Sequence, residues 1–168
     1  MTAVVLLLAG CAAKHDSQRL SWAATNQLHF VDAVVAADNY RAAAGSLAMK
    51  KSSSPELREF GRLLWEESTE TNSRLKWLLM KTEPGVVLPS GVFPRDMFVI
   101  DELIPTNGEE FDRRFIAQQI ASLEQSLALA QGYSRAGDDH DLKDFAERSV
   151  PKIQMQLDRL NELKMRLG

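Results

Sequence analysis

Residues 54–78 read SPELREFGRLLWEESTETNSRLKWL, and this stretch decides the fold. Ser54 supplies an N-cap hydroxyl, and Pro55 follows in the first turn, where its missing N–H is not needed. Apolar or small residues then recur at steps of three and four, which is the spacing of one helix face. They are Leu57, Phe60, Leu64, Ser68, Thr71, Leu75 and Leu78. The stretch therefore predicts a long amphipathic helix.

Three further segments have the same periodicity, so we expect four helices. Residues from about 20 to 50 predict the first, with a stripe of Ala24, Leu28, Val31, Val35, Asp38, Ala42, Gly45 and Met49. Thr106 and Glu109 form a capping box that begins the third, with Ile116, Ile120, Leu123, Leu127 and Ala130 on one face. The turn Gly137-Asp138-Asp139 leads into the fourth, whose stripe is Leu142, Phe145, Val150, Ile153, Leu157, Leu160 and Leu163. Pro151 predicts a kink or break near Ser149.

Four amphipathic helices bury their stripes most simply as an antiparallel four-helix bundle, an all-α fold. The first and third connections are short, which favours antiparallel neighbours. Residues 82–105, by contrast, form a long link that contains Pro84, Pro89, Pro94 and Pro105. We interpret this link as a crossover between helices two and three, the arrangement of ferritin-like bundles.

Composition narrows the possible functions. The chain has 168 residues, 45% of them apolar, which suits one globular domain. Its net charge of −3 argues against a nucleic-acid partner bound through a strongly basic surface. With a single cysteine, the chain forms no intramolecular disulfide.

The first eleven residues, MTAVVLLLAGC, predict export. The apolar run is too short to span a bilayer but is typical of a signal-peptide core. Leu8-Ala9-Gly10-Cys11 resembles the bacterial lipoprotein box, in which the cysteine is acylated after cleavage before it. No Lys or Arg precedes the run, although a signal peptide normally begins with a basic segment. The alternative to a signal peptide is a buried N-terminal helical turn with a free thiol at Cys11. We therefore expect a signal peptide at residues 1–10, a lipidated tether at 11–18 and the bundle domain at 19–168.

Several motifs occur in an order that resembles a known family. They are Phe30-Val31, residues 57–64 (LREFGRLL), residues 111–115 (FDRRF) with Gln119, and residues 142–146 (LKDFA) with Pro151. The chain resembles an uncharacterised family of exported bacterial ferritin-like four-helix domains, described as "predicted outer membrane protein". The resemblance implies the fold and export of the protein. It implies no activity, because the family has no established common biochemical activity. Cys11 is followed by Ala12 and not by Asp. By resemblance to the sorting of enterobacterial lipoproteins, this implies an outer-membrane lipoprotein that faces the periplasm.

The chemistry of a ferritin-like centre is mostly missing from the sequence. A di-iron bundle uses Glu-x-x-His pairs, and no such pair occurs in the chain. The histidine positions implied by the family resemblance correspond to Ser68, Leu123 and Gln156. The three histidines, His15, His29 and His140, fall in the tether, early in helix one and at a turn. Motifs for a nucleophilic serine or a phosphate loop are also absent. We therefore expect no enzyme, no metal site and no cofactor other than the lipid on Cys11.

Some polar residues nevertheless fall on the predicted stripes. Asp38 is expected either to become exposed through drift of the helix phase or to pair with an arginine such as Arg41. A hydrogen-bonded layer is expected from Ser68, Gln119, Ser126 and Gln156, with a ligand pocket as the alternative. We interpret Glu66, Glu67 and Glu70 as solvated surface, and residues 138–141 (DDHD) as a helix cap rather than a cation site.

Apolar residues concentrate in the crossover, and part of it is a candidate for docking a partner. The candidate residues are Val92, Phe93, Met97, Phe98 and Ile100. The alternative is that the segment folds back and covers the bundle. Trp65 and Trp77 are expected to pack beside the second stripe, and Trp22 to contact the membrane surface.

Two functional hypotheses follow from the sequence. The first is a membrane-anchored, non-catalytic envelope lipoprotein with a structural or protein-interaction role, including that of a subunit in a larger envelope complex. Its partners are the membrane and another envelope protein. The second is a ferritin-like periplasmic protein that binds a metal or small ligand through Asp38, Glu67 and the polar stripe residues.

Overall fold

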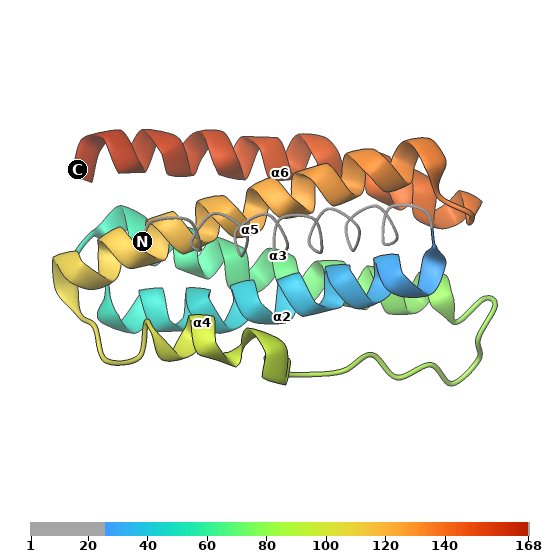
Figure 1. Cartoon of the computed structure of the whole chain (residues 1–168), viewed down its shortest axis with the longest axis horizontal. Coiled ribbons are helices and arrows are strands. Elements are labelled where there is room, and N and C mark those ends of the chain that lie inside the picture. The colour runs from blue at the N-terminus through green and yellow to red at the C-terminus, as the bar shows by residue number, and fades with distance from the viewer. Residues whose placement is uncertain (1–25, 168) are drawn as a thin grey trace, which may run out of the picture.

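The computed structural model describes residues 26–167, and all of their regular structure is helical (Figure 1). The four long helices are α2 (Gln27–Lys51), α3 (Pro55–Leu79), α5 (Gly108–Ala136) and α6 (His140–Leu167). The link between α3 and α5 contains a 3₁₀ turn, η1 (Pro94–Asp96), and a short helix, α4 (Met97–Asp101). None of these helices is long and apolar enough to cross a membrane. The predicted signal peptide and tether, with Cys11, His15 and Trp22, lie outside the described residues.

Side-chain caps explain where α3 and α6 begin. The Ser54 hydroxyl accepts the Leu57 N–H at 3.2 Å, and the Asp139 carboxylate accepts the Leu142 N–H at 2.8 Å. The predicted capping role for the acidic turn before α6 is therefore confirmed. The predicted Thr106 capping box is wrong, because the Thr106 hydroxyl instead donates to the Leu103 carbonyl at 2.9 Å. Asn107 takes the N-cap position, and Gly108 follows with a φ of 58°.

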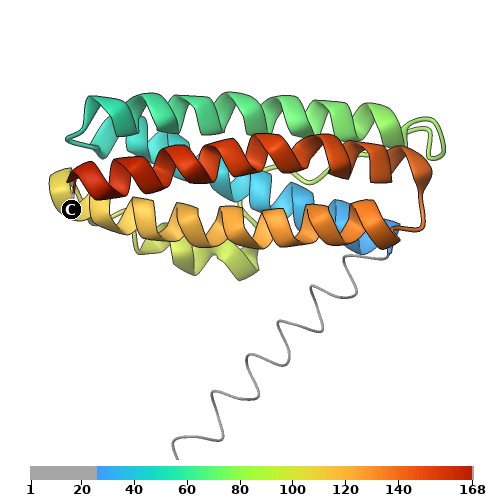
Figure 2. The same ribbon diagram turned by 90° about the horizontal axis from the view of Figure 1, so that it is seen from above.

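The long link returns the chain along the bundle. α3 ends at the same end of the bundle as the start of α2, and α5 begins at the opposite end (Figures 1 and 2). There the Lys51 ammonium donates to the carbonyls of Ile104 and Thr106 at 2.5 and 3.1 Å. α3 and α5 therefore run in the same direction, as the crossover prediction requires. The helical bundle is confirmed, whereas its assignment to the ferritin-like class stays a prediction.

Two apolar clusters form the core. One is centred on Phe60, Phe111 and Phe115, near the α2–α3 turn. The other contains Phe30, Tyr133 and Phe145, near the α5–α6 turn. In the second cluster the rings of Phe30 and Tyr133 stack with centroids 4.0 Å apart. The core is thus divided along the bundle axis.

Three expectations about individual residues are wrong, and the break predicted near Ser149 is absent. Leu28 is 66% exposed because the buried face of α2 passes through Phe30, Val35 and Ala44. Trp65 and Trp77 are 47% and 62% exposed instead of packed. Lys81 lies over the Trp77 ring, 4.7 Å from its centroid. α6 also continues without a break through Pro151.

Two glycines set the distance between α2 and α3. A Cβ atom on Gly61 would lie 2.7 Å from the Gly45 carbonyl oxygen and 2.8 Å from the Ala48 Cβ. Real Cβ atoms do not approach other atoms so closely, so the two backbones pack at a separation that only glycine allows.

Gly61→Ala should destabilise the bundle by about 1–3 kcal/mol, because the added methyl group forces α2 and α3 apart. In an unconstrained helix the same change would stabilise, since alanine is the better helix former. Chemical denaturation would measure the difference, with Ser73→Ala on the exposed face of α3 as the control, expected within about 0.5 kcal/mol of the wild type. A Gly61→Ala protein as stable as the wild type would contradict this account of the α2–α3 contact.

Candidate functional site

A layer of polar residues lies between the two apolar clusters. Asp38 and Arg41 of α2 form an ion pair in this layer and are only 3% and 7% exposed. The Arg41 guanidinium also donates to the Ser126 hydroxyl of α5 at 2.7 Å. Residues three apart lie on the same face of a helix, so both side chains of the pair reach the interior together. The expectation that Asp38 is exposed is therefore wrong, and the alternative pairing with Arg41 is confirmed.

The other half of the layer joins α3 to α6. The Gln156 amide donates to the Glu67 carboxylate, and Ser68 is 3% exposed. Burial raises the pKa of Asp38, Arg41 opposes that change, and the negative charge of Glu67 adds to it. The second carboxylate oxygen of Asp38 is buried and has no hydrogen-bond partner. Three of the four residues of the predicted layer are thus bonded, Ser126 to Arg41, Gln156 to Glu67 and Gln119 to Tyr40, rather than to one another.

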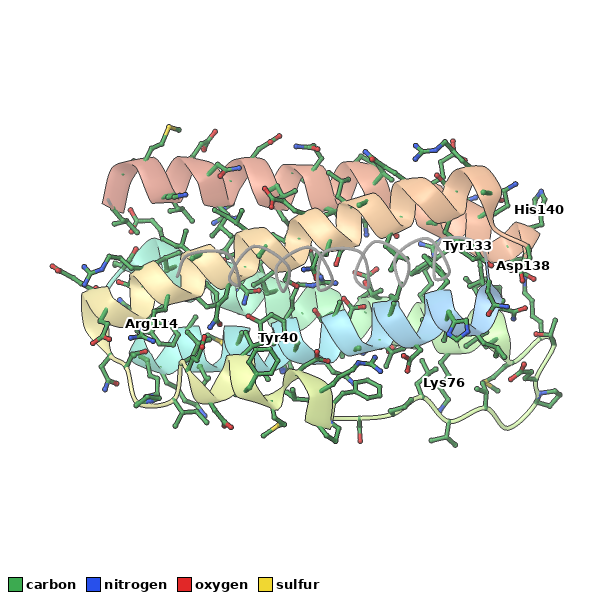
Figure 3. All side chains as sticks on the ribbon, viewed as in Figure 1. Tyr40, Lys76, Arg114, Tyr133, Asp138 and His140 are labelled. Atoms are coloured by element: carbon green, nitrogen blue, oxygen red, sulfur yellow. The ribbon has the colours of Figure 1, made fainter. Side chains whose placement is uncertain are left out.

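The layer contains its own cation. A guanidinium beside Asp38 already neutralises that carboxylate, and it repels any further positive ion. Among residues 26–167, no three His, Cys, Asp or Glu side chains come together as a metal site would require. His29 and His140 are exposed, and His140 lies at the α5–α6 turn near Asp138 (Figure 3). The arrangement is that of a structural ion pair.

A second polar group fastens the crossover to the bundle. The Tyr40 hydroxyl donates to the Gln118 side chain at 3.1 Å and accepts from the Gln119 amide at 3.0 Å. Gln118 in turn donates to the Val99 carbonyl and the Glu102 carboxylate, both at 3.1 Å. Figure 3 shows Tyr40 beside α4. Burial raises the pKa of the Tyr40 phenol, so it remains a neutral donor.

These contacts give α4 and its C-terminal turn two different faces. Ile100 and Leu103 are 6% and 0% exposed and join the core, whereas Phe98 is 65% exposed. Met97 and Ile104 are also partly open to solvent. We call Met97, Phe98 and Ile104 the α4 outer face.

The structure divides the residues that the sequence singled out for docking. Ile100 faces the core and is withdrawn from that set, since its side chain is covered by the bundle. Val92 and Phe93 are partly buried against the two apolar clusters. Met97 and Phe98 remain accessible. The alternative that the crossover covers the bundle therefore holds for its inner residues.

Sequence reasoning missed the Tyr40–Gln118 connection. Nothing in a single sequence indicates that a tyrosine and a glutamine 78 positions apart are in contact. Ile104 was also missed, because it stands apart from the apolar run of residues 97–100. Arg41 was detectable, since its spacing from Asp38 is that of neighbours on one helix face.

Arg41→Met should destabilise the protein by about 3–5 kcal/mol at neutral pH, because it leaves the Asp38 carboxylate buried without its counter-charge. Without Arg41 the pKa of Asp38 rises further above its unfolded value of 3.8. The folded state then binds the Asp38 proton more tightly than the unfolded state does. The loss of stability caused by Arg41→Met therefore becomes smaller as the pH falls toward the unfolded pKa. Denaturation of both proteins at several pH values would measure this.

The double variant Asp38→Leu/Arg41→Met serves as the control, because it removes both charges and should recover most of the lost stability. An Arg41→Met protein that loses less than about 1 kcal/mol, at every pH, would contradict a buried charge at Asp38.

Comparison with known proteins gives one family and one similar fold. No curated protein matches the chain. A solved structure described as "CopM in the Cu(II)-bound form" matches with a TM-score of 0.71 at 14% sequence identity. The match covers 85% of this chain and 98% of that one, and at such low identity it shows a shared fold alone. A family model described as "Domain of unknown function (DUF4142)" matches residues 12–163. The chain therefore belongs to the DUF4142 family.

Proposed function

We propose that this protein is a non-catalytic lipoprotein of the bacterial cell envelope, anchored through an acylated Cys11, whose bundle binds another envelope protein. The observation that carries the proposal is the contrast between the two faces of α4. Its inner face is fixed by Ile100 and Leu103, so the α4 outer face is a rigid apolar surface and not a loose loop. The remaining assignments, outer-membrane location and a ferritin-like origin of the fold, belong to the same proposal.

The charges around the α4 outer face define the partner. Asp101 and Glu102, which follow Phe98 by three and four positions in the chain, are exposed. Arg95, the nearest basic residue in sequence, is paired with Asp32 of α2 at 2.8 Å. Lys51 borders the surface at Ile104, where its ammonium donates to the backbone carbonyl, so the acidic residues stand at the Phe98 side. An apolar centre with acidic residues on one side fits a protein that offers an apolar pocket with Lys or Arg at that side. Phe98, the aromatic residue of the α4 outer face, would anchor this surface in the pocket of the partner.

The anchor part of the proposal rests on Cys11 and the residues before it. A cysteine that carries several acyl chains holds a protein on a membrane, since each buried CH₂ contributes about 0.8 kcal/mol. Residues 12–25 then connect the lipid to the start of the bundle.

Phe98→Ser should abolish the partner complex that native purification from membranes in mild detergent recovers. Met155→Ser is the matched control, because Met155 of α6 is 63% exposed and Phe98 is 65% exposed. Neither change should alter stability by more than about 0.5 kcal/mol, since both side chains lie at the surface. In the same experiment Cys11→Ala should move the protein from the membrane fraction to the soluble periplasmic fraction.

The two parts of the proposal can be contradicted separately. Elution of the native protein alone, or an unchanged complex with Phe98→Ser, would remove the interaction role. An unchanged location and mass of Cys11→Ala would remove the lipid anchor.

Metal binding is the second candidate, favoured by the likeness of the fold to the copper-bound CopM structure. The residues of the polar layer do not fit a copper ion. Cu(II) takes imidazole nitrogen and oxygen donors in a square arrangement, but the layer contains no imidazole, and its carboxylates are bonded, Asp38 to Arg41 and Glu67 to Gln156. We therefore infer that the interior of this bundle does not offer a copper site.

Asp38→Ala and Glu67→Ala should leave copper binding unchanged, because the Arg41 charge beside Asp38 repels a metal ion and no group of three His, Cys, Asp or Glu forms among residues 26–167. Equilibrium dialysis of the purified full chain against Cu(II), followed by metal analysis, would measure the bound copper. One retained equivalent in the wild type, lost in either variant, would overturn this conclusion and favour the metal-binding function.

A further inference from the structure

A small cleft lies between α3 and α6, which run side by side (Figure 2). Its volume is about 40 Å³, and its floor is Phe145. Around the floor it is lined by Glu70, Thr71, Arg74, Arg148, Ser149 and Lys152. None of the residues of the α4 outer face lines this cleft.

The charge of this cleft is opposite to that of the chain. Three positive side chains and one negative one line it, whereas the whole protein carries a net charge of −3. Two of the cations, Arg74 and Lys152, have no ion-pair or hydrogen-bond partner within the described part of the chain. By contrast, Arg62, Arg95 and Arg114 elsewhere on the surface each pair with a carboxylate.

The remaining lining groups suit an anion with several oxygen atoms. The Thr71 hydroxyl has no bonding partner among residues 26–167 and can donate. Ser149 already donates its single hydroxyl proton to the Phe145 carbonyl at 2.8 Å, so that proton is not available to an anion. Arg148 has a carboxylate neighbour, Asp144, at 3.8 Å, too far for a hydrogen bond that would occupy its donors. Glu70 is the one carboxylate in the lining, and it lies on the same helix as Arg74.

We propose that this cleft binds a phosphate group, held by Arg74, Arg148 and Lys152, with the Thr71 hydroxyl as a neutral donor. Arginine forks match the geometry of phosphate oxygens, and a lysine adds a compact charge. Inorganic phosphate and the headgroup of an anionic phospholipid share this chemistry. The proposal depends neither on the lipid anchor nor on the α4 partner.

Calorimetric titration with inorganic phosphate, using the full chain with Cys11→Ala so that no acyl group contributes, should give saturable binding. Arg148→Gln should weaken it at least about fivefold, since a charge-assisted hydrogen bond is lost at a partly exposed site. Arg113→Gln is the matched control, because Arg113 and Arg148 are each 66% exposed and each face a carboxylate at 3.8 Å. Arg74→Gln combined with Arg148→Gln should abolish binding.

A second arm distinguishes the two sources of phosphate. Sedimentation with mixed phosphatidylcholine–phosphatidylglycerol vesicles, against pure phosphatidylcholine vesicles, measures recognition of the lipid headgroup. Saturable binding in either arm that Arg148→Gln loses and Arg113→Gln keeps supports the site. Absence of binding in both arms, or equal loss in the two variants, overturns it, because equal loss indicates only diffuse attraction between charges.

Discussion

Arg41 is a positive charge enclosed in the middle of a helical bundle, and the arrangement around it depends on keeping it paired. Burying an isolated cation costs far more than one hydrogen bond returns, so Asp38 and Ser126 must both reach it. This requirement fixes the rotation of α2 about its axis and its register against α5. The Gly45–Gly61 contact then fixes the separation of α2 from α3.

The same ion pair explains why the core consists of two clusters instead of one continuous stripe. Apolar side chains pack on either side of the polar layer, around Phe60 toward one end and Phe30 toward the other. A continuous apolar interior would permit α2 to slide or rotate by a turn at little cost. A buried ion pair with a single partner position penalises such shifts, which is the best-attested role of buried polar groups in helical assemblies.

The helices and their order were predictable because their signals are local. Caps such as Ser54 and periodic stripes such as Leu57 to Leu75 need only neighbouring residues to be interpreted. The phase of α2 was not predictable, because small alanines on several faces blur its stripe, and Leu28 was assigned to the wrong side. The division of the crossover into buried Ile100 and exposed Phe98 also depends on contacts with Tyr40 and Gln118, which no local pattern encodes.

The path of the crossover determines which surfaces of the bundle stay open. Arg95 pairs with Asp32, and the Asn39 amide donates to the Pro89 carbonyl at 2.9 Å, so the link lies against α2. The groove between α3 and α6 is on another side and keeps its unpaired cations accessible. Arg41 is paired inside the bundle and the crossover lies against α2, whereas both surfaces proposed for binding lie on the outside. Its two candidate surfaces, α4 and the α3–α6 cleft, can therefore act at the same time.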